Sequence, residues 1–509
     1  MSDSRTKNSK RNIISGAFRQ VLNIGLAFVS RTIVIYLMGE QFLGLGSLFS
    51  SILAVLNLAD LGFTTAVVYV LYKPVAENDR DAICAIIAYL KRIYTVIGTV
   101  IFLGGMAVLP FLNSLINGGY PDGINIYVLY FMYLGNTVVS YWMFAYKSAL
   151  FTAMQRADVV DNIYSVSSCL MKVSQLALLL IFRNYYLYTL ILPLGTVLNN
   201  LLLHFYSRKF FPDILPKGKL HGSIRETLNK QVQAIFIGKV GDVARNSCDS
   251  IFLSAMLGLT MVAVYDNYMY IFNSIIGVVW MVCNAVQASI GNSMVKESVE
   301  KNLEDFYRFD FIFAWINGWC TICLCCLYQP FMQIWMKGDP DLMLSNFNMV
   351  LISFYFYAVA VNNVRNLYVN GAGLFWNLRI WYILETAGKI ILNLVLGYFF
   401  GVTGIVLATL LAVFFFNFIA RSNVLFGNYF KTPVKTFYAN HLKYFLILVA
   451  NCLVTFLCCS LVKLDGWAGL ILRGVLCVLV PNVLFFLVYC KTGVFQRSVQ
   501  LAKAVLKAR

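Results

Sequence analysis

The stretch GKVGDVARNSCDS, residues 238–250, decides the fold, because it carries four charges between two strongly apolar segments. Lys239, Asp242, Arg245 and Asp249 follow one another at intervals of three, three and four residues. Such intervals place side chains on one face of an α-helix. As a helix, the stretch lies within a membrane span and gives it a charged face. As a loop, it would reverse the direction of every later span.

The composition of the whole chain favours membrane-spanning helices. Of the 509 residues, 60% are hydrophobic and 12% are charged, whereas soluble domains carry about 25% charged residues. Long apolar segments recur along the chain, and about 20 such residues are what a helix needs to cross a bilayer. We therefore predict an all-α polytopic membrane protein rather than a membrane-spanning barrel.

The apolar segments give the number of spans. We expect about fourteen transmembrane helices. They cover residues 13–38, 42–71, 86–112, 124–146, 160–182, 184–206, 231–257, 261–290, 309–335, 345–369, 378–400, 402–424, 441–463 and 468–490. The stretch 238–250 then forms the middle of the seventh span.

Basic residues are distributed unevenly over the predicted connections. With a cytoplasmic N-terminus, most Lys and Arg fall on the cytoplasmic side, whereas the outer connections hold Arg183, Lys337 and Lys463. This is the asymmetry of the positive-inside rule, so both termini are predicted to be cytoplasmic. The net charge of +17 then reflects loops that face anionic lipid, and no nucleic-acid partner is expected.

The chain also contains an internal repeat. Residues 37–52 (LMGEQFLGLGSLFSSI) resemble residues 256–271 (MLGLTMVAVYDNYMYI), and Gly39 matches Gly258. Two six-helix halves of the same orientation would place a substrate path between them. The predicted organisation is an N-terminal lobe at 1–206, a basic cytoplasmic linker at 207–230, a C-terminal lobe at 231–424, an extra helix pair at 441–490 and a basic amphipathic tail at 491–509.

Ionisable residues occur inside several spans, where each costs about 2.5–3.5 kcal/mol to insert and usually faces a polar interior. Aligned polar faces in both halves predict a hydrated central cavity. The candidate substrate-binding residues are Arg19, Asn23, Arg31, Lys172, Lys239, Arg245, Arg365 and Lys389. The candidate ion-coupling residues, or members of structural ion pairs, are Asp60, Asp242, Asp249, Asp266 and Glu385. Cations outnumber acids, which favours an anionic substrate such as a phosphate.

One region resembles a known family. Gly39 is followed by Gly44, by Ala-Asp-Leu-Gly-Phe at 59–63 and by Lys-Pro-x-x-x-x-Asp from Lys73. This pattern resembles the start of the polysaccharide transport proteins, the flippases of lipid-linked O-antigen and capsule oligosaccharides. They belong to the multidrug/oligosaccharidyl-lipid/polysaccharide exporter superfamily, which also holds multidrug extruders and the peptidoglycan-precursor flippase.

The resemblance implies a function. It implies that the chain is a transporter of the bacterial inner membrane that moves an undecaprenyl-pyrophosphate-linked oligosaccharide outward by alternating access, for surface polysaccharide biosynthesis. Other membrane proteins of polysaccharide assembly are expected partners. Family members typically meet the pyrophosphate with cations of the first helix, here Arg19 and Arg31. Arg19 is the stronger candidate because its own helix supplies no carboxylate, whereas Asp242 lies within reach of Lys239 and Arg245.

Two other transport functions stay open: a drug/cation antiporter that uses one of the acids above, and a flippase for lipid II, the peptidoglycan precursor. We expect no enzyme activity, because the outer connections are short and carry no catalytic constellation. No cofactor is expected, although Na⁺ or H⁺ coupling stays open. Cys320, Cys323, Cys325 and Cys326 are interpreted as small buried apolar residues rather than as a metal site.

Overall fold

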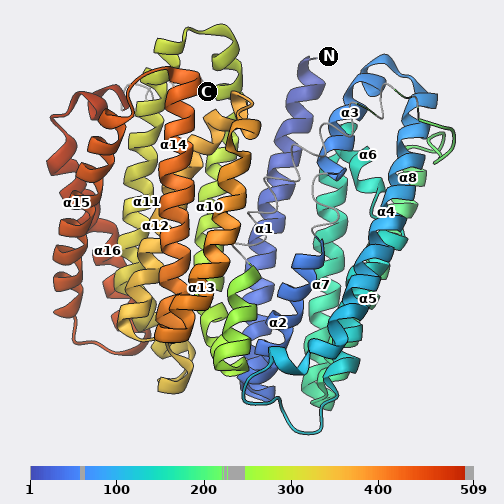
Figure 1. Ribbon diagram of the computed structural model, residues 1–509, viewed down its shortest axis with the longest axis horizontal. Coiled ribbons are helices and arrows are strands. Elements are labelled where there is room, and N and C mark those ends of the chain that lie inside the picture. Colours follow the sequence, from blue (N-terminus) through green and yellow to red (C-terminus); the bar gives the residue numbers. More distant parts are fainter. Residues whose placement is uncertain (1, 58–62, 221, 223–225, 227–246, 499–509) are drawn as a thin grey trace. The chain divides into compact units, whose positions relative to one another are not determined.

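The computed structural model describes residues 2–57, 63–220, 222, 226 and 247–498. Every regular element in this part of the chain is a helix (Figure 1). Nine of the described helices are long and apolar enough to cross a membrane, judged by length and composition. The chain divides into two compact units, Met1–Ala263 and Val264–Arg509. The predicted lobe boundaries, the count of fourteen spans and the side on which the termini lie stay predictions.

The first unit contains eight labelled helices, a further helix at Ser247–Leu257 and two short 3₁₀ turns. The helices are α1 (Ser2–Met38), α2 (Glu40–Leu56), α3 (Phe63–Glu77), α4 (Arg80–Val108), α5 (Ile126–Trp142), α6 (Lys147–Ala153), α7 (Ala157–Phe182) and α8 (Tyr185–Phe210), with 3₁₀ turns at Leu109–Phe111 and Asn113–Leu115. Helix α7 packs against α1 and α8, and α5 packs against α4 and α8. Buried Leu48 and Phe49 of α2 join Leu129 and Tyr130 of α5 in the apolar core.

The second unit contains the other labelled helices. They are α10 (Leu259–Lys296), whose first residues belong to the first unit, α11 (Val299–Trp335), α12 (Asn346–Gly371), α13 (Phe375–Ala412), α14 (Ala420–Leu425), α15 (Lys435–Ser460) and α16 (Gly466–Tyr489). A 3₁₀ turn spans Pro340–Leu342, and π-helical segments at Val413–Ile419 and Phe426–Phe430 flank α14. Helix α11 packs against α12, α15 and α16.

Helix starts follow local capping chemistry. The Asn125 side chain accepts hydrogen bonds from the backbone N–H groups of Tyr127 and Val128 at the start of α5. Asn184 does the same at the start of α8, and Ser298 and Ser345 cap α11 and α12. Each cap satisfies backbone donors that have no partner within the helix.

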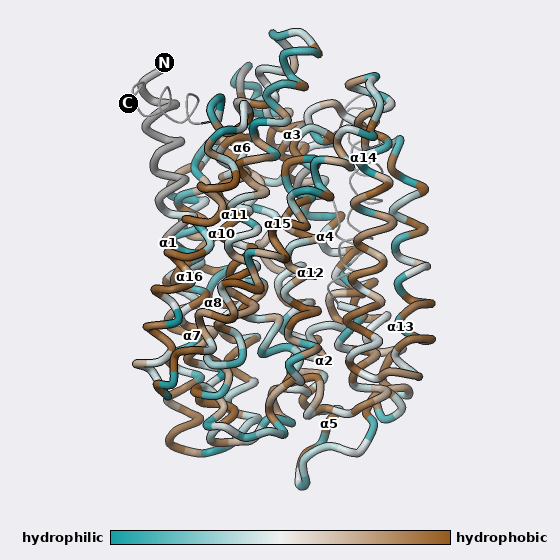
Figure 2. Tube along the Cα trace, turned by 90° about the vertical axis from the view of Figure 1, so that its left-hand side faces the viewer, coloured by the Kyte–Doolittle hydropathy of each residue, from teal (hydrophilic) through white to brown (hydrophobic). Residues whose placement is uncertain are grey.

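Apolar side chains cover the outer faces of the long helices. Figure 2 shows hydrophobic residues along most of their length. Large apolar side chains remain exposed, for example Val100 and Leu103 of α4 and Leu453 and Leu457 of α15. Soluble monomers rarely expose such continuous apolar surface, so these faces are suited to contact lipid.

The predicted span 42–71 contains α2 and α3, and residues 58–62 between them lie outside the described residues. The predicted span 124–146 ends early, because Met143 leaves the helical conformation at φ −92° and ψ −116°. Asn200 of α8 accepts a hydrogen bond from the backbone N–H of Phe144 at 3.1 Å. A neighbouring side chain thus satisfies a backbone group that the break releases, which makes the break tolerable at membrane depth.

Glycines mark the boundaries that the sequence predicts best. Gly39 precedes α2 at φ 100° and its repeat partner Gly258 precedes α10 at φ 89°, a conformation that costs glycine little. The boundary between the predicted spans 378–400 and 402–424 coincides with a kink at Gly401, at φ 55° and ψ −132°. Within the stretch 238–250, residues from Ser247 onward are helical, and residues 238–246 lie outside the described residues.

Gly44→Ala is expected to destabilise the protein. A Cβ at Gly44 would overlap the backbone carbonyl of Leu259 at the start of α10, so one backbone must move. Such overpacking costs about 1–3 kcal/mol. Gly25→Ala on α1 is the matched control, because a Cβ there meets nothing within 4 Å and alanine favours the helix by about 1 kcal/mol. Thermal unfolding in detergent should show a lower Tm for the first variant only; equal Tm values would contradict this packing.

Candidate functional site

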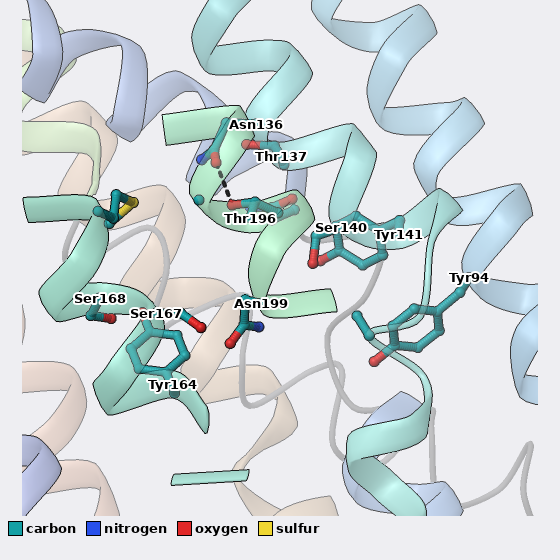
Figure 3. A pocket seen from close by; sticks show the side chains of 14 residues that line it. Tyr94, Asn136, Thr137, Ser140, Tyr141, Tyr164, Ser167, Ser168, Thr196 and Asn199 are labelled. Atoms are coloured by element: carbon teal, nitrogen blue, oxygen red, sulfur yellow. Dashed lines mark hydrogen bonds between the residues drawn. The ribbon is translucent and has the colours of Figure 1, made fainter. Parts of the chain in front are cut away.

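A polar cavity of about 350 Å³ lies within the first unit. It is lined from α4, α5, α7 and α8 and from Asn57 after α2, and Figure 3 shows its hydroxyl and amide side chains together with three tyrosines. The polar lining residues are Asn57, Tyr94, Asn136, Thr137, Ser140, Tyr141, Tyr164, Ser167, Ser168, Thr196 and Asn199.

The lining is polar but uncharged among the described residues. Thr196 donates a hydrogen bond to the Asn136 side-chain oxygen at 2.6 Å, which leaves the amide N–H groups of Asn136 for other partners. Hydroxyl and amide groups can both donate and accept hydrogen bonds, and tyrosine rings offer apolar faces with a polar tip. A neutral, polyhydroxylated ligand such as a sugar matches this combination better than an ion does.

Arg19 of α1 lies beside this cavity. Its guanidinium is centred 4.9 Å from the ring of Tyr164, a lining residue. Its Nη1 also forms an ion pair of 2.5 Å with Asp161 of α7. The lack of a carboxylate near Arg19 on its own helix therefore does not leave Arg19 unpaired, because the partner comes from another helix 142 residues away in the chain. The Arg19 side chain keeps 39% exposure, so it can still reach a ligand.

Arg31 and Lys172 are two positively charged residues that lie close to each other. Lys172 of α7 lies close enough to Arg31 of α1 to interact electrostatically. Arg31 also interacts electrostatically with the hydroxyl of Tyr188 on α8. Ser30 hydrogen-bonds to the Tyr188 hydroxyl at 2.9 Å, which holds α1 against α8 there. Two neighbouring positive charges in a low-dielectric region repel each other, and an anion between them would relieve that repulsion.

Lys147 provides a further cation, one that the sequence does not single out. It lies on α6, outside the nine candidate spans, and is buried next to His204 of α8, whose Nδ1 is 3.1 Å from the Lys147 Nζ. Burial lowers the pKa of Lys147 to about 8, and the positive charges of Arg208 and Lys91 contribute to this lowering. Nothing in the sequence distinguishes Lys147 from a loop lysine, because its burial depends on the break after α5.

The side chain of Arg365 on α12 makes its contacts with other protein side chains. It is fully buried in the second unit, stacks on Phe418 with 4.3 Å between its Cζ and the ring centre, and hydrogen-bonds to Asn362 and Ser422. Asp310 of α11 is an electrostatic partner. These contacts favour a structural role, and its predicted role in substrate binding remains a prediction.

The other predicted residues are placed as follows. Glu385, Lys389 and Asn393 share a buried face of α13. Asp249 is buried, and Asn23 and Asp266 are half-buried. Asp60, Lys239, Asp242 and Arg245 lie outside the described residues. Arg19 and Arg31 of α1 thus lie beside α7, which carries Lys172. The roles of these three residues stay predictions.

The sequence does not predict the lining of this polar cavity, since all the candidate residues except Asn23 are charged and none of them lines it. A signal was present in the recurrence of small polar residues on single helices, such as Asn136, Thr137 and Ser140 on α5, and Thr196 and Asn199 on α8. Spacings of three or four residues place such side chains on one helix face. Uncharged hydroxyls are common in membrane helices, however, so each one alone carries little information.

Solved structures share this fold, whereas no family model and no curated protein matches the chain. The lipid II flippase MurJ in an inward closed conformation aligns over 94% of this chain and 98% of its own, with a TM-score of 0.69 and 13% identity. A point mutant of the Vibrio cholerae MATE transporter VcmN covers 84% of this chain and 99% of its own, with a TM-score of 0.59 and 12% identity.

A third neighbour is a MOP-superfamily transporter from Pyrococcus furiosus, described as having a binding pocket of reversed polarity. It covers 84% of this chain and 97% of its own, with a TM-score of 0.58 and 14% identity. At these identities the similarity concerns the fold alone, and it spans nearly the whole length of each neighbour. The chain therefore has the fold of the transporters and flippases of the MOP superfamily.

Proposed function

We propose that this protein is a flippase that moves an undecaprenyl-pyrophosphate-linked oligosaccharide from the cytoplasmic to the outer leaflet of the bacterial inner membrane. The observation that carries the proposal is the pairing of an uncharged polar cavity with cationic side chains in the same unit. The cavity offers hydroxyl, amide and tyrosine groups. Arg19 stacks on its Tyr164, and Lys172 follows its lining residues Ser168 and Met171 on α7.

The two parts of the site suit the two parts of such a substrate. Sugars present hydroxyl groups at fixed angles and apolar ring faces, which the cavity's amides, hydroxyls and tyrosine rings can engage. A pyrophosphate is an anion, and charge-assisted hydrogen bonds from Arg and Lys are stronger than neutral ones. The polyprenyl chain would stay in the bilayer while the lobes alternate between inward-facing and outward-facing states.

A lipid II flippase is the second candidate, because the structural similarity to MurJ covers 94% of this chain. Lipid II also joins sugars to a polyprenyl pyrophosphate, so the same cavity and cations would serve it. The two candidates differ in the glycan, and competition between the two lipids for transport by the purified protein separates them.

A drug/cation antiporter has less support in the described part of the first unit. A cationic drug calls for an accessible carboxylate near the cavity. Asp161 of α7, three residues before the lining residue Tyr164, is engaged by Arg19 at 2.5 Å. The lining itself contributes no carboxylate among the described residues.

Removing polar groups from the cavity is expected to weaken glycan transport. Thr196→Val with Asn199→Leu deletes hydrogen-bonding groups of about 1 kcal/mol each. Export should fall about 5–30-fold at limiting substrate, measured by surface glycan staining at equal protein level. Thr99→Val is the control, because its hydroxyl is exposed on α4 and bonds to Thr95 of the same helix. Unchanged export in the double variant would remove the cavity from the substrate path.

The Arg19–Asp161 pair distinguishes substrate binding from a structural role. If Arg19 binds the pyrophosphate, Arg19→Ala removes charged hydrogen bonds of about 1.5–3 kcal/mol and lowers export about 10–100-fold. Asp161→Asn should then maintain or raise export, because it releases the guanidinium. If the 2.5 Å pair only joins α1 to α7, the two variants should lose export and Tm alike. That parallel loss would contradict the binding role.

A further inference from the structure

Three cysteines from three helices converge in the second unit, and a fourth, Cys323, lies beside them. The sulfurs of Cys326 on α11, Cys459 on α15 and Cys477 on α16 all lie within 4.8 Å of one another, and all three residues are buried. The Cys459 and Cys477 sulfurs are 3.7 Å apart. The Cys323 thiol lies one helical turn before Cys326, donates to the Cys477 carbonyl oxygen at 3.8 Å and is within reach of the Cys477 sulfur.

This spacing fits a tetrahedral thiolate site. Zinc–sulfur bonds of about 2.3 Å place neighbouring ligand sulfurs about 3.8 Å apart, close to the 3.7 Å between Cys459 and Cys477. Cys323 and Cys326 form a Cys-x-x-Cys pair on one face of α11. Thiolate ligands select soft or borderline cations such as Zn²⁺ rather than Mg²⁺ or Ca²⁺. Sequence spacing alone identifies only the α11 cysteines as possible metal ligands, since Cys459 and Cys477 lie more than a hundred residues away.

The surroundings also suit the charge of such a site. Buried thiolates are costly unless they are paired or bind a metal. Zn²⁺ with three thiolates carries one net negative charge, and with four it carries two. Arg473 of α16 lies alongside, where its Nε donates to the Cys459 carbonyl oxygen at 3.4 Å and its Nη2 donates to the Val462 carbonyl oxygen at 2.9 Å. Cys459 is one residue from Ser460, the last residue of α15. An ion could therefore reach the site from the connection between α15 and α16.

We propose that Cys326, Cys459 and Cys477, with Cys323 as the fourth ligand, bind a thiophilic metal ion, Zn²⁺, that fastens the α15–α16 pair to α11. The site is independent of the transport function proposed above. Ligands from three helices would make metal loading part of the stability of this helix pair, since binding free energy adds to folding free energy.

Metal analysis of the full-length protein tests the proposal. The chain is purified under reducing conditions from zinc-supplied cells, and zinc is measured by mass spectrometry. About one zinc per chain is expected, with loss in Cys326→Ser/Cys477→Ser. Cys458→Ser is the matched control, since Cys458 neighbours Cys459 on α15 but is not part of the cluster, and it should retain the metal.

A second measurement keeps the proposal testable if the double variant does not fold. Cd²⁺ is added to the wild-type protein after chelation, and thiolate-to-cadmium charge-transfer absorption should appear and saturate near one equivalent, with a rise in Tm. Absence of both bound zinc and a cadmium signal would overturn the proposal. So would a Cys459–Cys477 disulfide in protein prepared without reductant and with free thiols blocked at lysis, because it would consume two of the ligands.

Discussion

Arg365→Ala is expected to lower the stability of the second unit far more than the loss of a solvent-exposed arginine does. The guanidinium is fully buried between Phe418 and Phe437, at 4.3 and 5.2 Å from their ring centres. It is also the electrostatic partner of Asp310, which pairs with His441 of α15 at 2.9 Å. The substitution removes the guanidinium that Asn362 and Ser422 contact and opens a space in the core, and such a truncation of a large buried side chain costs about 3–5 kcal/mol.

The measurement is Tm in detergent, together with the yield of monodisperse protein. Arg379→Ala is the control, because Arg379 stacks on Trp376 of the same helix end at 4.2 Å, in a solvent-exposed contact. A contact of this kind is worth about 0.5–1 kcal/mol. Arg365→Lys should fall in between, since it keeps the charge but loses the planar stacking group. If Arg365→Ala and Arg379→Ala shift Tm equally, the structural role of Arg365 is wrong.

Lys172→Glu is expected to reduce glycan export about 100-fold or more. The change removes one of two neighbouring cations and places an acid next to Arg31. The acid would pair with Arg31, and two sets of charged hydrogen bonds of about 1.5–3 kcal/mol each would be lost to the substrate. Glutamate, like lysine, is an ionisable residue within a span, so its insertion cost remains comparable and the loss of export is not attributable to failed insertion.

The experiment compares surface glycan at equal membrane levels of the protein. Lys91→Glu on α4 is the control, because Lys91 is exposed and lies outside the proposed site. Lys172→Arg should retain most export, since it keeps the charge. Normal export by Lys172→Glu would show that the Arg31–Lys172 pair does not handle the anionic part of the substrate.

Much of the fold follows from local sequence signals, which is why it can be predicted. Apolar length places the long helices, asparagine and serine caps place their starts, and Gly39, Gly258 and Gly401 mark the turns at positive φ. The break after α5 could not be predicted, because the group that makes it tolerable, Asn200, comes from α8. Local patterns carry no information about a partner of this kind.

The site could be predicted only in part, for the same reason. Helical spacing predicts that Glu385, Lys389 and Asn393 share one face of α13, and all three are buried in the structure. The Arg19–Asp161 pair joins residues 142 positions apart. The sequence of α1 alone therefore cannot show that a carboxylate partly neutralises Arg19. The stretch 238–250 is helical from Ser247 onward, and the roles of its earlier charged residues stay predictions.

Translocation by the purified protein in proteoliposomes tests the proposed transport directly. A short-chain polyprenyl-pyrophosphate-linked oligosaccharide is placed in one leaflet, and its arrival in the other is followed by a membrane-impermeant glycan-modifying enzyme. We predict translocation by the wild-type protein, a loss with Lys172→Glu and no transport of a cationic dye. Transport of the dye under an ion gradient, with no movement of the lipid-linked glycan, would contradict the flippase function.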